Sequence, residues 1–94
     1  MHIGILTLYL QIPGCTSLKE KRSRLKPLLA RLHREFNISV AEMDKHDIWQ
    51  ESTIVCTLAS NDKGFTQRSL QSVSRWIETN WPDMVLLDNQ IELL

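Results

Sequence analysis

A chain of 94 residues, of which 43% are apolar and 23% charged, can bury one hydrophobic core but not two, so residues 1–94 are expected to form a single domain. Eleven basic residues balance eleven acidic ones, which excludes a protein that attracts nucleic acid or membranes through its overall charge. No apolar run approaches the ~18 residues of a membrane span, so no membrane association is expected.

The first predicted element is a strand over residues 3–12, where leucines at every second position alternate with residues such as Thr7 and Tyr9. Both faces of this strand are expected to be at least partly covered. Pro13 and Gly14 end it. Because no Lys or Arg precedes the stretch and it lacks a cleavage-site pattern, it is interpreted as a strand and not as a signal peptide.

A helix is predicted to begin after Ser17, since Ser17 and Glu20 have the spacing of a capping box. Pro27 has no N–H to donate to the carbonyl of Ser23, so we expect either a kink near Ser23 or a division into a short and a longer piece. Asn37 is expected to end the helix. Apolar residues at helical spacing form a stripe that must pack on the sheet: Leu18, Leu25, Leu28, Leu29, Leu32 and Phe36.

Two further strands are predicted at residues 38–43 and 51–60. Ile38 and Val40 share one face of the first of these strands, and apolar residues recur at every second position in the other. The connection between them, residues 44–47, is polar. The two strands are therefore expected to form a hairpin.

A second helix is predicted after Asn61 and Asp62, which are good capping residues, and it should stop before Pro82. Residues 84–93 then form the last strand. The order β-α-β-β-α-β predicts an α+β fold of the ferredoxin-like split βαβ type. In that fold a four-stranded antiparallel sheet carries two helices on one face.

Basic residues concentrate in the first predicted helix. Between positions 19 and 35 there are seven Lys or Arg residues against Glu20 and Glu35, a local excess of five on a chain without net charge. Stability alone disfavours cations in the first turns by ~0.3 to 1 kcal/mol each, because the helix dipole is positive there. One interpretation is a surface that contacts RNA phosphates, and the other is a solvated face built from good helix formers. The candidate nucleic-acid-binding residues are Lys19, Arg22, Lys26, Arg31 and Arg34.

The sheet face away from the helices is expected to be partly apolar, and such surfaces usually mark an interaction site. Base stacking on it is disfavoured, because Tyr9 is the aromatic residue of the first strand and residues 51–60 contain none. A homodimer through this face or its edge is favoured instead. Trp49 is interpreted either as a partner anchor or as a cap on one end of the core. The candidate interface residues are Ile5, Thr7, Tyr9, Trp49, Thr53, Val55 and Thr57.

The sequence assembles no recognisable catalytic site, so no enzyme activity and no cofactor are expected. Glu42, Asp44 and His46 would share a face of a regular strand, but such residues near a hairpin tip are usually solvated, and no metal is expected. Cys56 alternates with apolar residues and is predicted to lie in the core. Cys15 lies in a turn that could expose it, although exposure alone does not activate a thiol. The cysteine spacing suggests neither a disulfide nor a zinc site, which fits a reducing cytoplasm.

Four segments of the chain carry a family resemblance: SLKEKR at 17–22, VAE at 40–42, DIWQ at 47–50 and SND at 60–62. In order and spacing they resemble the YlxP-like family of small bacterial proteins of unknown function. The resemblance implies a ferredoxin-like fold, a bacterial cytoplasm, and a gene often found among those for transcription, translation initiation and a ribosome-binding factor. It implies no reaction and no catalytic residues.

The leading hypothesis is a non-catalytic protein of the cytoplasm that docks on RNA or a ribosomal particle through the basic helix. The alternative is a homodimeric module that senses a ligand or scaffolds other proteins through the exposed sheet face. An active site could also form across a dimer interface, but the sequence offers no nucleophile, base or cofactor loop for it.

Overall fold

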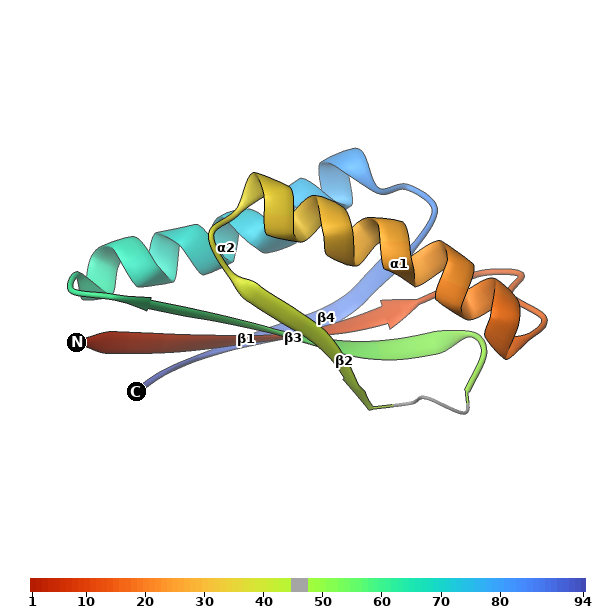
Figure 1. The fold of residues 1–94 in the computed structure, drawn as a ribbon, viewed down its shortest axis with the longest axis horizontal. Coiled ribbons are helices and arrows are strands. Elements are labelled where there is room, and N and C mark those ends of the chain that lie inside the picture. Colours follow the sequence, from red (N-terminus) through yellow and green to blue (C-terminus); the bar gives the residue numbers. More distant parts are fainter. Residues whose placement is uncertain (45–47) are drawn as a thin grey trace.

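The computed structural model describes residues 1–44 and 48–94. These residues form one antiparallel sheet in the order β2-β3-β1-β4, and both helices cover the same face of it (Figure 1). The arrangement confirms the ferredoxin-like α+β fold. Along the chain, the elements of the described residues are β1 (His2–Gln11), α1 (Leu18–Glu35), β2 (Ser39–Asp44), β3 (Glu51–Ser60), α2 (Lys63–Asn80) and β4 (Val85–Leu93).

β1 lies in the interior of the sheet and separates the core from the open face. It pairs with β3 from His2 to Gln11 and with β4 on its other side. Its even-numbered leucines face the helices and are at most 1% exposed, whereas Thr7 and Tyr9 on the opposite face are half-buried. The alternation predicted from the sequence is thus confirmed, because successive side chains of a strand point to opposite faces.

α2 packs closely on the sheet. A Cβ atom added at Gly4 of β1 would lie 2.6 Å from side-chain carbons of both Leu70 and Thr66, so the absence of a side chain at Gly4 permits this approach. Asp62 caps the helix by accepting a hydrogen bond from the backbone N–H of Phe65 at 3.1 Å. The helix ends at Asn80, before Pro82, as predicted.

α1 is a single helix of 18 residues with Pro27 inside it, so the division into two pieces, one of the two expected alternatives, does not occur. The missing hydrogen bond is tolerated because Leu25, Leu28 and Leu32, on both sides of Pro27, are buried in the core. The helix ends at Glu35 with Phe36 as its C-cap, one residue before the predicted position.

Both edges of the sheet are irregular. On β2 the register against β3 shifts between Glu42 and Asp44. On β4 the register shifts opposite Tyr9 and Leu10 of β1. Bulges of this kind interrupt the row of backbone groups that another strand would need for pairing. The fold therefore makes the open face a better candidate for self-association than either edge.

Candidate functional site

The start of the basic helix α1 is set by its cap. Ser17 accepts a hydrogen bond from the backbone N–H of Glu20 at 3.0 Å, which is half of the predicted capping box. The carboxylate of Glu20 takes other partners: it accepts from the hydroxyl of Thr16 at 3.2 Å and from Arg24 at 3.4 Å. The Glu20 carboxylate thus joins Thr16, which precedes the helix, to Arg24 within it.

Lys21 has an internal role, because its side chain is only 2% exposed. Its Nζ donates to the carbonyl of Ile48 at 2.7 Å and lies 3.0 Å from Oε2 of Glu42. The hydroxyl of Ser52 donates to the same carboxylate oxygen at 2.7 Å. A buried amine is costly unless it is paired and hydrogen-bonded, so this cluster serves to join α1 to β2 and β3.

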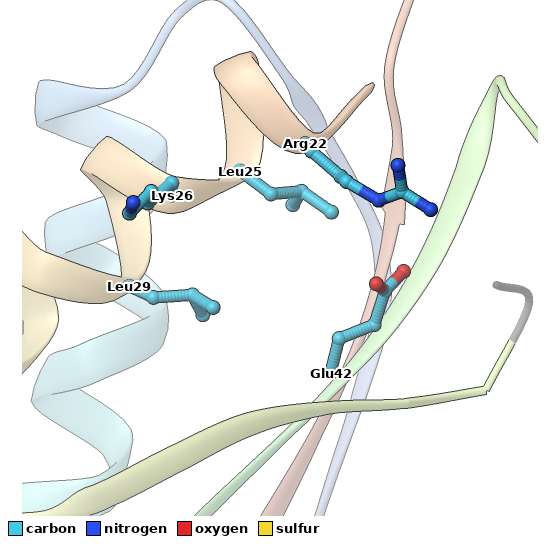
Figure 2. A pocket seen from close by; sticks show the side chains of 5 residues that line it. All are labelled: Arg22, Leu25, Lys26, Leu29 and Glu42. Carbon is cyan, nitrogen blue, oxygen red and sulfur yellow. The ribbon is translucent and has the colours of Figure 1, made fainter. Parts of the chain in front are cut away.

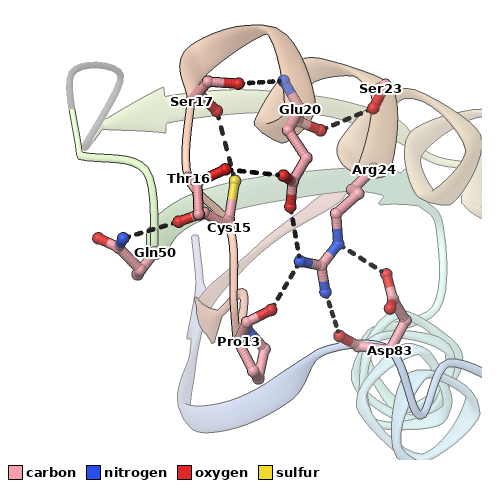
Figure 3. A network of polar contacts seen from close by, with 9 residues as sticks. All are labelled: Pro13, Cys15, Thr16, Ser17, Glu20, Ser23, Arg24, Gln50 and Asp83. Carbon is pink, nitrogen blue, oxygen red and sulfur yellow. Dashed lines mark hydrogen bonds and ion pairs between the residues drawn. The ribbon is translucent and has the colours of Figure 1, made fainter.

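Arg24 is also used inside the molecule, as Figure 3 shows. Its guanidinium donates to the side chain of Asp83 at 3.0 Å, to the carbonyl of Asp83 at 2.8 Å and to the carbonyl of Pro13 at 2.7 Å. The hydrogen bond to the Asp83 carboxylate raises the pKa of Arg24, because it favours the charged form. Arg24 therefore ties α1 to the loop after β1 and to the loop before β4.

Arg31, one of the five candidate nucleic-acid-binding residues, already contacts Glu35 and Trp76. It is 40% exposed and donates to the carboxylate of Glu35 at 3.3 Å. Its guanidinium carbon also lies 5.3 Å from the ring centre of Trp76, a cation–π distance. Trp76 in turn stacks on Trp81 at 6.0 Å and meets Phe36 edge-on at 6.3 Å. A phosphate contact by Arg31 would compete with these interactions.

The other four candidates, Lys19, Arg22, Lys26 and Arg34, are exposed. Among the described residues none of them has an ion-pair partner within 4.0 Å. Lys19, Arg22 and Lys26 are spaced by three and four residues, which places them along one side of the helix. We call these three residues the basic face. Arg34 lies about two turns further along.

Beside the basic face is a groove between α1 and β2. Its cavity has a volume of about 250 Å³ and is lined by Arg22, Leu25, Lys26, Leu29 and Glu42. Figure 2 shows Leu25 and Leu29 pointing from α1 toward β2, and the guanidinium of Arg22 lying toward the carboxylate of Glu42. We call this feature the α1–β2 groove. It combines an apolar wall with charged groups of both signs.

The candidate interface residues differ in how far each side chain is exposed. Thr53 is 8% exposed, and Trp49, which precedes β3, is 43% exposed and outside the core cluster of the described residues. Met43 of β2, 60% exposed, borders a shallow hollow of about 260 Å³ on this face. The remaining candidates are half-buried: Ile5, Thr7, Tyr9, Val55 and Thr57.

Neither thiol is placed for nucleophilic chemistry. Cys56 is fully buried, as predicted, and burial raises its pKa to about 12. Cys15 is also fully buried, so the exposure suggested by its turn is wrong. Its thiol donates to the carbonyl of Ser17 at 3.4 Å, and its own carbonyl accepts from the side chain of Gln50 at 2.7 Å. These contacts hold the turn to the start of α1 and to Gln50, which precedes β3 (Figure 3).

Glu42 is the one residue of the Glu42, Asp44 and His46 set whose side chain the structure describes. Glu42 is held by Lys21 and Ser52, whereas His46 and the side chain of Asp44 lie outside the described residues. In residues 1–44 and 48–94 no three His, Cys, Asp or Glu side chains come together as metal ligands would. In the same residues neither helix has the length and apolar content needed to cross a membrane.

Sequence reasoning did not identify the α1–β2 groove or the ion pair that borders it. Lys21 falls near the edge of the leucine stripe, and Glu42 was considered only as a metal ligand. The available signal was a basic residue beside an apolar stripe and an acid on the following strand. That signal does not specify a pair, because the register between a helix and a strand is set by packing.

The sequence is similar to a known family and to a curated bacterial protein. The model of DUF503, described as a protein of unknown function, matches residues 3–91. The uncharacterized protein YlxP of Bacillus subtilis (strain 168) is 36% identical over 63 residues, which are 67% of this chain and 68% of the relative.

Proposed function

The chain belongs to the DUF503 family, whose description names no activity, and we propose that it is a non-catalytic protein that docks on RNA or a ribosomal particle through α1. The proposed compartment is the bacterial cytoplasm. Two free, buried cysteines and a relative from Bacillus subtilis support that choice.

The observation that carries the proposal is the basic face. Lys19, Arg22 and Lys26 are exposed and lack an ion-pair partner among the described residues, although Lys21 and Arg24 on the same helix are paired. Stability gives no reason to place Lys19 and Arg22 near the start of the helix, where the dipole is positive. Three aligned cations suit a row of phosphates, whose negative charges they would neutralise.

Arg34 and Arg31 are expected to contribute less. Arg34 lies beyond the end of the basic face, and Arg31 is shared with Glu35 and Trp76. Three phosphate contacts predict that the logarithm of the RNA affinity falls against the logarithm of salt concentration with a slope of about −2 to −3.

The test is RNA binding by the purified chain and by the triple variant Lys19→Glu/Arg22→Glu/Lys26→Glu. Co-sedimentation with ribosomal subunits and with free ribosomal RNA, at low and moderate salt, measures both targets. We expect binding that weakens with salt and falls at least about tenfold in the variant, because repulsion replaces three phosphate contacts.

A matched control separates the basic face from net charge. Lys63→Glu/Arg68→Glu/Arg75→Glu changes the charge equally, at exposed positions of α2. It should keep most of the binding, and circular dichroism should show that both variants are folded. Equal losses in the two variants would reduce the effect to overall charge and contradict the proposal. So would a folded wild-type chain that binds no RNA at low salt.

The alternative function is a homodimeric module for ligand sensing or scaffolding. The observation that favours it is the open face, where apolar side chains such as Ile5 and Val55 remain half-exposed beside the more exposed Met43. Sedimentation of the wild-type chain and of Val55→Glu would test it. A dimer that dissociates in this variant and is stabilised thermally by a metabolite would favour this function over RNA docking.

A further inference from the structure

We infer that the α1–β2 groove receives an unpaired base of a single-stranded RNA whose phosphates lie on the basic face. The inference rests on the proposed function and makes it more specific, because it selects single-stranded over double-stranded RNA. It gives a role to Leu25 and Leu29, which line the groove but could not bind a phosphate.

The size of the groove suits one ring system. Its volume of about 250 Å³ is several times the ~30 Å³ that one water occupies in the liquid and lies just below the ~300 Å³ at which pockets for drug-sized ligands begin. Leu25 and Leu29 supply an apolar wall, and the planar guanidinium of Arg22 lies at one end (Figure 2). Unstacked bases pack on apolar side chains and on guanidinium planes.

The charges of the groove also suit a nucleotide. Lys26 lies on the α1 side, where a phosphate would be held, whereas the guanidinium of Arg22 lies toward the carboxylate of Glu42 (Figure 2). Lys21 and Ser52 already engage that carboxylate, so the guanidinium of Arg22 is the group that would receive a base, by stacking on it or by donating to its edge. A nucleotide of a single strand would thus place its base at Arg22 and its phosphate at Lys26.

The open face of the sheet is less suited to RNA. Asp88 of β4 lies opposite Tyr9 of β1, and Glu92 lies opposite Ile5, so both acids share the open face with Tyr9. Phosphates on that face would be repelled by these carboxylates. Among the described residues, the α1 side therefore offers the more favourable combination of cations and an apolar hollow.

The experiment compares a fluorescent ~10-nucleotide single strand of mixed sequence with a duplex of the same sequence, by anisotropy, for the wild type and Leu29→Trp. The larger indole should fill the groove while leaving the basic face intact. We expect the wild type to prefer the single strand and the variant to lose about tenfold in single-strand affinity, which is the scale of one base contact. Duplex binding should be unchanged. Leu87→Trp, at an exposed position of β4, makes the same change away from the groove and should bind both RNAs like the wild type.

Each other outcome overturns the inference in a distinct way. Equal loss of single-strand and duplex binding in Leu29→Trp would show that the groove does not discriminate. Unchanged single-strand binding in that variant, with binding still lost in the basic-face variant, would leave the proposed function standing without a base in the groove. No binding of either RNA by the wild type would remove both. A change in oligomeric state in Leu29→Trp without RNA would assign the groove to a second copy of the chain.

Discussion

The two helices cover the same face of one sheet, but they meet it differently. The backbone of α2 comes close to β1, β3 and β4, where Gly4 leaves room for Leu70 and Thr66. The close approach of α1 is to β2, and long side chains fill the space beneath it. Lys21 is the extreme case, because its amine reaches Glu42 on β2.

The difference separates a helix that approaches the sheet closely over Gly4 from one that long side chains hold off. A helix held off by leucines and a lysine leaves the α1–β2 groove at its margin. Hollows border α2 as well, at Trp76 and at Phe65. The substitutions below change one mode of packing at a time, in order of decreasing expected effect.

Removing the buried cation of α1 should have the largest effect. Lys21→Met keeps the length of the side chain but withdraws the charge that neutralises Glu42, which is only 20% exposed. We expect a loss of roughly 3 kcal/mol in the free energy of unfolding, at the lower end of the range for broken buried pairs. Urea unfolding measures it. The double variant Lys21→Met/Glu42→Leu should recover most of the loss, and a double variant as unstable as the single one would contradict a role for the pair.

Crowding the close contact of α2 should cost somewhat less. In Gly4→Val the new side chain meets Leu70 and Thr66 at 2.6 Å, and we expect a loss of about 1 to 3 kcal/mol from overpacking. Gly64→Ala is the matched control. Its Cβ comes closest to the guanidinium end of Arg68, at 2.9 Å, and lies in ordinary contact with Asp62 at 3.4 Å, so the helix should gain ~0.5 to 1 kcal/mol. Similar thermal denaturation midpoints in the two variants would contradict close packing at Gly4.

The third prediction concerns the layer under the helices, where burial raises the pKa of Cys56 from 9.0 to about 12. Above about pH 9 the unfolded thiol loses its proton while the native one keeps it. Stability from the neutral thiol is therefore complete below pH 9 and is lost as the pH rises toward 12, with a loss of ~1.4 kcal/mol by pH 10, one unit above the unfolded pKa. Cys56→Ala should lack this loss when urea unfolding is followed across the interval. Parallel pH profiles for the two chains would contradict a buried, protonated thiol.

Local patterns were sufficient to predict the elements and their order. The caps at Ser17 and Asp62 depend on side chains within three residues of the atoms that they bond, so they can be read from the sequence. Pro27 was harder to interpret, because a local rule predicts disruption while the leucines on both sides of it pack into one core. The basic character of α1 was also visible in the sequence, although the use of each cation was not.

The sequence by itself determined the strand and helix periodicity, the capped helix starts and the excess of positive charge on α1, because these depend on neighbouring residues. The tertiary structure decided which cations are available. Arg24 donates to Asp83, which lies 59 residues away, and Lys21 enters the core to reach Glu42 on the next strand. Such partners are brought together only when the helix docks, and docking also creates the α1–β2 groove. Lys19, Arg22 and Lys26 remain exposed beside that groove because they lie on the side of α1 that faces away from the core.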